Sequence, residues 1–158
     1  MKPQLLALVL ATATATAATT PTFAADVTAD NPAALAEVLR AMGYRAELTK
    51  DDQGDPKIVS ATGGSNFRIY FYGCTANLNC TSIQFAAGFD LTNGSTLEVM
   101  NAWNTAKRYS KSYLDSEQDP LIEMDVNLAF GGVSEQNFRD TLDLWDGLLG
   151  QFKTHIGF

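Results

Sequence analysis

Two clusters of carboxylates are the first residues of this chain that could do chemistry. In each cluster an aspartate is followed four residues later by an Asp-Pro pair: Asp51 by Asp55, and Asp115 by Asp119. Such oxygen ligands suit a hard cation such as Ca²⁺, but neither cluster has the alternating acids and closing glutamate of a calcium loop. Aspartate, glycine and proline also form tight turns, in which the aspartate bonds its own backbone. We therefore predict two similar turns and no metal site, with a divalent-cation or small-ligand sensor as the alternative function.

Hydrolytic chemistry would depend on His155, the only histidine, which stands three residues before the end of the chain. The sequence contains no Gly-x-Ser-x-Gly motif and no phosphate-binding glycine motif. Glu123 and Asp125 form a carboxylate pair, but they fall on the polar face of a predicted strand, where acids are normally solvated. The sequence thus predicts no catalytic residue and no cofactor, and a hydrolase with a carboxylate-based site is the second alternative.

A row of aromatic and basic side chains indicates recognition. Arg68, Tyr70 and Tyr72 alternate with apolar residues, so they share the strand face that points away from the core. Exposed tyrosines beside an arginine are common in protein-recognition surfaces, although a helix or terminal segment packed over this row is the other interpretation. Asn101 and Asn104 lie three apart on a predicted helix, where they either cap neighbouring backbone or contact a ligand. These five residues are our candidate partner-binding set.

Cys74 and Cys80 are the only cysteines of the chain. Their spacing differs from the Cys-x-x-Cys of redox enzymes, and a single histidine leaves a zinc ion short of ligands. In an exported chain such a pair typically forms a structural disulfide, which would add roughly 2 kcal/mol of stability in the chain-entropy model. If the two cysteines face each other, the flanking strands pair Ile69 with Phe85, so that apolar residues meet across the hairpin.

The N-terminus predicts export. Lys2 precedes an uninterrupted apolar run at residues 5–11, and a tract rich in alanine and threonine follows. This order is typical of a cleavable secretory signal, whereas a membrane anchor would need roughly 20 mostly apolar residues. Small residues favour cleavage after Ala24. We predict a signal peptide at residues 1–24, a single domain at residues 25–158, and a periplasmic or secreted location.

The charge balance narrows the choice of partners. The chain has 11 basic and 18 acidic residues, a formal net charge of −7, and it loses Lys2 with the signal. So negative a surface repels phosphate backbones, and nucleic acid is therefore excluded as an expected partner. No segment after the signal is long and apolar enough to span a bilayer.

Hydrophobic periodicity predicts an α+β fold with the order α-β-β-β-β-α-β-β-α. We expect an antiparallel sheet of five to six strands with three helices packed on it. The second helix should begin with a capping box from Ser95 to Glu98.

The last helix carries a broad apolar stripe and should run from about Ser134 to His155. Six residues at helical spacing form the stripe: Phe138, Leu142, Trp145, Leu149, Phe152 and Ile156. Leu144 and Leu148 widen it to one side. The stripe either packs on the sheet or, at Leu144 and Leu148, forms the seam of a homodimer.

Five segments of the chain together resemble one protein family. They are residues 51–56, 70–74, 101–104, 114–120 and 137–145. In this order they look like the YbjN family, described as regulators of bacterial sensory transduction, and the resemblance covers nearly the whole chain after the signal. It implies a fold similar to type III secretion chaperones, often dimeric, and it brings no catalytic residues. We therefore predict an exported, non-enzymatic binding or regulatory module that engages a protein or peptide partner.

Overall fold

The computed structural model describes residues 26–158, so the predicted signal peptide and its cleavage site lie outside the described residues. The elements in chain order are β1 (Asp26–Val27), α1 (Pro32–Ala41), β2 (Glu47–Lys50), β3 (Pro56–Thr62), β4 (Ser65–Tyr72), β5 (Ser82–Gly88), α2 (Leu97–Ala106), β6 (Lys111–Leu114), β7 (Pro120–Asn127), β8 (Val133–Ser134) and α3 (Glu135–Ile156). Within the described residues, no helix has both the length and the apolar character that crossing a membrane requires.

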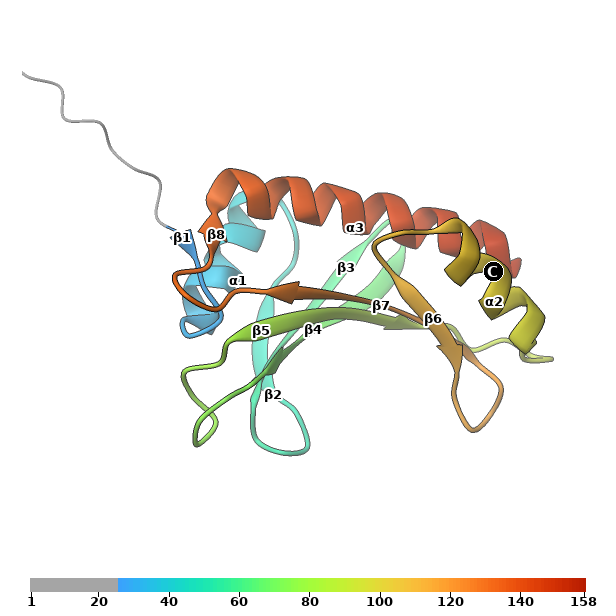
Figure 1. The fold of residues 1–158 in the computed structure, drawn as a ribbon, viewed down its shortest axis with the longest axis horizontal. Coiled ribbons are helices and arrows are strands. Elements are labelled where there is room, and N and C mark those ends of the chain that lie inside the picture. Colours follow the sequence, from blue (N-terminus) through green and yellow to red (C-terminus); the bar gives the residue numbers. More distant parts are fainter. Residues whose placement is uncertain (1–25) are drawn as a thin grey trace, which may run out of the picture.

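Six strands form one antiparallel sheet in the order β2-β3-β4-β5-β7-β6. The long helix α3 runs along one side of this sheet, with α1 near one of its ends and α2 near the other (Figure 1). This arrangement confirms the predicted α+β class, the three helices and the six-stranded sheet. A second sheet, made of β1 and β8, was not predicted, because two-residue strands are too short to show a hydrophobic period.

The central hairpin has the predicted register. Ile69 lies opposite Phe85, and Cys74 and Cys80 form the predicted disulfide in the loop between β4 and β5. Because the register places apolar residues opposite one another, Ile69 and Phe85 are both fully buried under the helices.

The core lies between the sheet and α3. Trp145 from α3 packs against two strand residues, with ring centroids 5.9 Å from Phe67 and 5.5 Å from Phe85. Leu148 belongs to this core and is only 5 % exposed, so it offers almost no surface for the predicted dimer seam. Leu144 is partly buried against the same core. The apolar stripe of α3 is thus used within the chain itself.

The helix starts follow local capping chemistry. The Asn31 side chain accepts from Ala34 N at the start of α1, and the Ser134 side chain accepts at the start of α3. The start of α2 differs from the prediction by one residue, because the capping side chain is that of Thr96, which accepts from Val99 N at 3.4 Å, and not that of Ser95.

The two acidic clusters form two closely similar turns, one between β2 and β3 and the other between β6 and β7. Asp51 Oδ1 accepts hydrogen bonds from the backbone N–H groups two and four residues later, and Asp115 Oδ1 does the same in its own turn. Each aspartate also donates its backbone N–H to the carbonyl four residues on, at 2.9 Å for Asp51 and 3.0 Å for Asp115. These two carboxylates are therefore turn-forming groups, as the turn prediction expected.

The second acid of each turn ties the hairpin to a neighbouring loop. Asp55 accepts from the side chain of Asn77 at 2.8 Å, and Asp119 accepts from the backbone N–H of Leu91 at 2.9 Å. Across residues 26–158, no three histidine, cysteine or acidic side chains gather in a way that could hold a metal ion.

Candidate functional site

One face of the six-stranded sheet is open. All three helices lie on the other side, and the described part of the chain places no element over this face (Figure 1). Along β4 the alternation sends Phe67, Ile69 and Phe71 into the core, while Arg68, Tyr70 and Tyr72 point to the open side. Tyr72 is 45 % exposed. The structure thus brings together the three strand residues of the predicted partner-binding set.

Gln84 extends this row across the next two strands. Gln84 lies on β5 opposite Tyr70 of β4 and is only 7 % exposed. Its Oε1 accepts from Tyr72 Oη at 3.3 Å, and its Nε2 donates to Asp125 Oδ1 at 2.8 Å. A buried amide with both ends bonded holds one orientation, so Gln84 fixes the positions of Tyr72 and Asp125.

The row continues to the far edge of the sheet. Tyr113 Oη donates to Glu123 Oε1 at 2.6 Å, and Lys111 Nζ lies 3.1 Å from Glu123 Oε2 and 3.6 Å from Asp125 Oδ2. Six side chains from four strands are therefore joined. We refer to them as the tyrosine network: Tyr72, Gln84, Asp125, Lys111, Glu123 and Tyr113.

The surroundings keep the two tyrosines and the lysine of the network protonated, because they raise the pKa of each. Burial, reinforced by the Glu123 carboxylate, raises the pKa of Tyr72 above its ordinary value of 10.0. Burial and then the hydrogen bond to Glu123 raise the pKa of Tyr113 much further. The hydrogen bond to Glu123 raises the pKa of Lys111. At neutral pH both phenols are therefore donors and Lys111 is a cation.

Two cations flank the network on β3 and β4. Lys57 lies opposite Tyr70 in the register, with its Nζ 5.9 Å from the centre of the Tyr70 ring. Arg68 is exposed and lies opposite the small residue Ala86 in the register. The open face thus combines tyrosine and arginine with a fixed polar network, which is a composition typical of recognition surfaces.

The two asparagines of the predicted set do not join this face. Asn104 on α2 donates its Nδ2 to Ser112 O at 2.9 Å and accepts from Ser112 N at 2.7 Å, so it binds the backbone of β6. Asn101 is exposed on the same helix. Of the two roles considered for Asn104, the structure places it in backbone capping.

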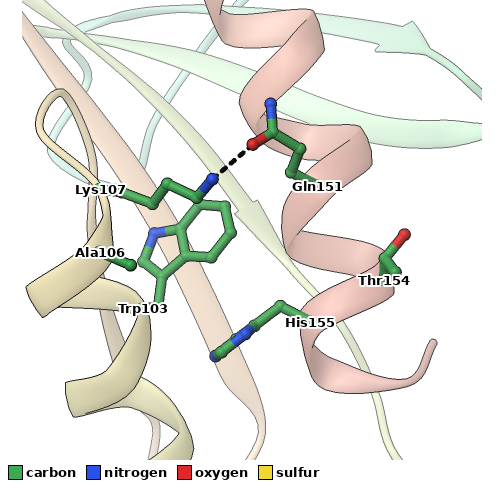
Figure 2. Close-up of a pocket in the computed structure, with 6 residues that line it drawn as sticks. All are labelled: Trp103, Ala106, Lys107, Gln151, Thr154 and His155. Carbon is green, nitrogen blue, oxygen red and sulfur yellow. Dashed lines mark hydrogen bonds between the residues drawn. The ribbon is translucent and has the colours of Figure 1, made fainter.

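His155 lies in a hollow of about 370 Å³ between the ends of α2 and α3 (Figure 2). Its Nε2 is 2.8 Å from the backbone oxygen of Val99, and the centre of its ring lies 5.4 Å from that of the Trp103 ring, with the two rings tilted by 52°. Lys107 lies over the Trp103 ring, with its Nζ 5.2 Å from the ring centre, and is bonded to Gln151. No carboxylate lines this hollow in the part of the chain that the structure describes, so the contacts of His155 serve to hold the two helices together.

Of the six network residues, only Tyr72 was in the predicted binding set, and neither Gln84 nor the four residues on β6 and β7 were identified. Glu123 and Asp125 were predicted to be solvated acids, and Lys111 and Tyr113 were not singled out. The sequence did not specify that β5 pairs with β7 and that β7 pairs with β6. These pairings bring the residues close to Gln84. The signal that could have found them is the outward position of all four on strands of alternating character.

An antiparallel sheet with helices on one face and a bonded polar network on the other defines an α+β domain with an open sheet face. A family model described as "YbjN: Putative bacterial sensory transduction regulator" matches residues 31–158, and the chain belongs to this family. No curated protein and no solved structure shows a significant match.

Proposed function

We propose that this chain is an exported, non-enzymatic binding or regulatory module that engages a protein or peptide partner through the open sheet face. The observation that carries the proposal is the tyrosine network, six side chains held in fixed positions on a face that no described element covers. Preorganised side chains lose little conformational freedom on binding, which favours affinity. The family description as a sensory transduction regulator fits a module of this kind.

The electrostatics favour binding over acid–base chemistry. A general acid or base works best when its pKa is near the operating pH. In the network the pKa values of Tyr72, Tyr113 and Lys111 are all shifted away from neutrality. Fixed donors and a fixed cation are what a partner surface needs for oriented hydrogen bonds.

Export is supported by the disulfide and by the sequence of residues 1–24. A disulfide persists mainly in oxidising compartments, and Cys74 and Cys80 are joined. In such a compartment the partner would be another exported protein or peptide.

The proposal is tested by affinity capture with the purified domain on a solid support. The exported fraction of the source bacterium is passed over wild type and over the double variant Tyr72→Ala with Tyr113→Ala, and the bound proteins are identified by mass spectrometry. We expect a reproducible partner on wild type that the double variant loses. The matched control is Tyr109→Ala, which removes an exposed tyrosine that lies outside the network. An identical set of bound proteins on wild type and the double variant would count against the open face.

A homodimer stays a prediction. Because Leu148 is buried in the core, only the partly buried Leu144 remains of the predicted seam. Light scattering of wild type and Leu144→Asp at several concentrations measures the mass directly, and a seam at Leu144 requires the variant to lower it.

A further inference from the structure

A second surface suited to binding lies on the helix side of the sheet, beside β2. A groove of about 480 Å³ lies between the start of α1, strand β2, the turn after it and the loop closed by the disulfide. Its apolar lining comes chiefly from Pro32, Ala33, Leu48, Pro56 and Leu78. Leu48 is 42 % exposed and Leu78 is 63 % exposed, so two large apolar side chains of the described chain face solvent here. A volume of this size holds one or two side chains of a ligand.

Strand β2 presents unpaired backbone beside this groove. In an antiparallel pair, every second residue bonds its backbone N–H and C=O to the partner strand. The residues between them direct these two backbone groups away from the partner, toward the outer edge of the sheet. The bond from Asp51 N to Asp55 O sets this alternation, so Thr49 bonds to β3 while Leu48 and Lys50 direct their N–H and C=O groups to the outer edge. Another extended strand can bond to the backbone groups of an outer edge of this kind.

A side chain caps one of the outward backbone groups beside β2. The backbone oxygen of Ala46, just before β2, points to the outer edge and accepts from the Arg40 guanidinium, at 2.7 Å from Nη2 and 3.1 Å from Nε. For Leu48 and Lys50 the structure of residues 26–158 records no such cap. The open stretch therefore coincides with the apolar groove.

The charge of the groove is opposite to that of the chain. The chain has 18 acidic residues against 11 basic ones, yet no acidic side chain lines the groove, and Lys50 does. Lys50 takes part in no ion pair within residues 26–158. The groove therefore offers a single free cation beside apolar walls and an open strand edge.

We propose that the groove and the outer edge of β2 bind an extended peptide segment that carries an apolar side chain and a carboxylate. The peptide backbone pairs with Leu48 and Lys50, the apolar side chain enters the groove against Leu48 and Leu78, and the carboxylate meets the Lys50 ammonium. The carboxylate is that of an acidic side chain or of a peptide C-terminus.

This site is separate from the open sheet face. Leu48 lies opposite Ile58, whose side chain is fully buried on the helix side of the sheet, so the groove and the tyrosine network lie on opposite sides. A variant in the groove therefore leaves the network intact, and failure of one proposal does not imply failure of the other.

The test uses fluorescein-labelled hexapeptides that alternate threonine with leucine, titrated with the purified full domain and followed by fluorescence anisotropy. One peptide ends in a free carboxylate, one is amidated, and one is amidated but contains a single glutamate. We expect saturable binding of a carboxylate-bearing peptide, and binding of the neutral amide weaker by about tenfold. Comparison of the two carboxylate peptides shows whether the C-terminus or the side chain supplies the charge. Equal affinity of all three peptides would overturn the role given to Lys50.

Two matched changes locate the binding. Leu48→Asp is expected to weaken it by about tenfold or more, whereas Leu97→Asp, at an exposed leucine on α2, leaves it unchanged. A peptide with N-methyl groups on alternate residues cannot donate along one edge and should bind about tenfold more weakly as well. The proposal is overturned if no peptide binds saturably up to about 1 mM, or if the two leucine variants weaken binding equally.

Discussion

The two edges of the six-stranded sheet are built from the same kind of hairpin, but their outward backbone groups are covered differently. Each edge strand, β2 or β6, has four residues and leads into an aspartate-closed turn. At the β6 edge the side-chain amide of Asn104 bonds both the N–H and the C=O of Ser112, as a neighbouring strand would. At the β2 edge Arg40 covers only the carbonyl of Ala46. The next outward residues, Leu48 and Lys50, line a groove.

This difference shows which edge leaves outward backbone groups uncapped. Exposed strand edges are a liability, and natural proteins normally cover or shorten them. Here an asparagine caps Ser112 in the middle of the β6 edge, whereas the corresponding Leu48 of β2 lies uncapped beside apolar side chains and Lys50. Two similar hairpins thus have differently covered edges, and the residues around each hairpin decide the difference.

Loss of the disulfide should have the largest effect on stability and should make the two edges differ most. Reduction, or Cys74→Ser with Cys80→Ser, is expected to lower the free energy of unfolding by about 2 kcal/mol. The loop that it closes contains three non-glycine residues with positive φ, at Ala76, Asn77 and Asn79, and it lies beside the β2 edge only. Urea unfolding with and without reductant measures the change, and hydrogen exchange should show faster opening at β2 than at β6. Equal acceleration at both edges would contradict this assignment.

Removal of the asparagine cap should open the β6 edge. Asn104→Ala leaves the backbone N–H and C=O of the buried Ser112 without partners, so we expect a loss of about 1 to 2 kcal/mol. Asn101→Ala, on an exposed position of the same helix, serves as the control and should change stability by less than about 0.5 kcal/mol. Urea unfolding of the two variants checks this. Equal losses would show that Asn104 does not act as the cap.

The two turns differ at three positions, and at one of them substitutions should have opposite effects in the two turns. Gly54 and Gln118 occupy the same place in their turns, and both have positive φ, 88° and 69°. Gly54→Ala should cost about 1 kcal/mol, because side chains are strained in this region, and Gln118→Gly should stabilise by about 0.5 to 1 kcal/mol. Thermal unfolding measures both, and changes of the same sign would contradict the equivalence of the turns.

The smallest effect should be the response of the β6 edge to alkaline pH. The hydrogen bond to Glu123 raises the pKa of Lys111 above its ordinary value of 10.5, and burial together with the hydrogen bond to Glu123 raises the pKa of Tyr113 above 10.0. The stability that these groups add is therefore complete below about pH 10 and is lost as the pH rises through their folded-state pKa values. The loss should be small, because both side chains are more than one third exposed.

Unfolding in urea at about pH 9, 10 and 11 measures the slope with which the free energy of unfolding falls as the pH rises. Tyr113→Phe should flatten it, whereas Tyr109→Phe, at an exposed tyrosine outside the network, should leave it unchanged. A slope that Tyr113→Phe does not alter would show that another group titrates.

Local patterns predicted the parts of the fold that depend on neighbouring residues. The register of the central hairpin followed from the Cys74–Cys80 pair together with the alternation around it, because a shift of one residue would reverse both faces. The two turns followed from aspartate, glycine and proline chemistry within five residues. The stripe of α3 was identified by its spacing, although spacing alone left open whether it packs on the sheet or on a second chain.

The parts that escaped prediction depend on contacts between distant residues. Gln84 reaches Asp125 only because β5 pairs with β7, and nothing local to either strand specifies that pairing. The Asn104 cap requires α2 to pack beside β6. The choice between Ser95 and Thr96 as the cap of α2 concerns adjacent hydroxyl residues of similar capping strength, so their order alone could not decide it.

The loop closed by Cys74 and Cys80 also has a consequence for timing. Residues 76–78 of this loop form one wall of the groove beside β2, and the disulfide holds that loop closed. In the cytoplasm, where thiols stay reduced, a newly made chain would lack the bond and the fixed wall. If the chain is exported as proposed, we expect the groove to become competent for peptides only once the disulfide has formed outside the cytoplasm, and not during synthesis.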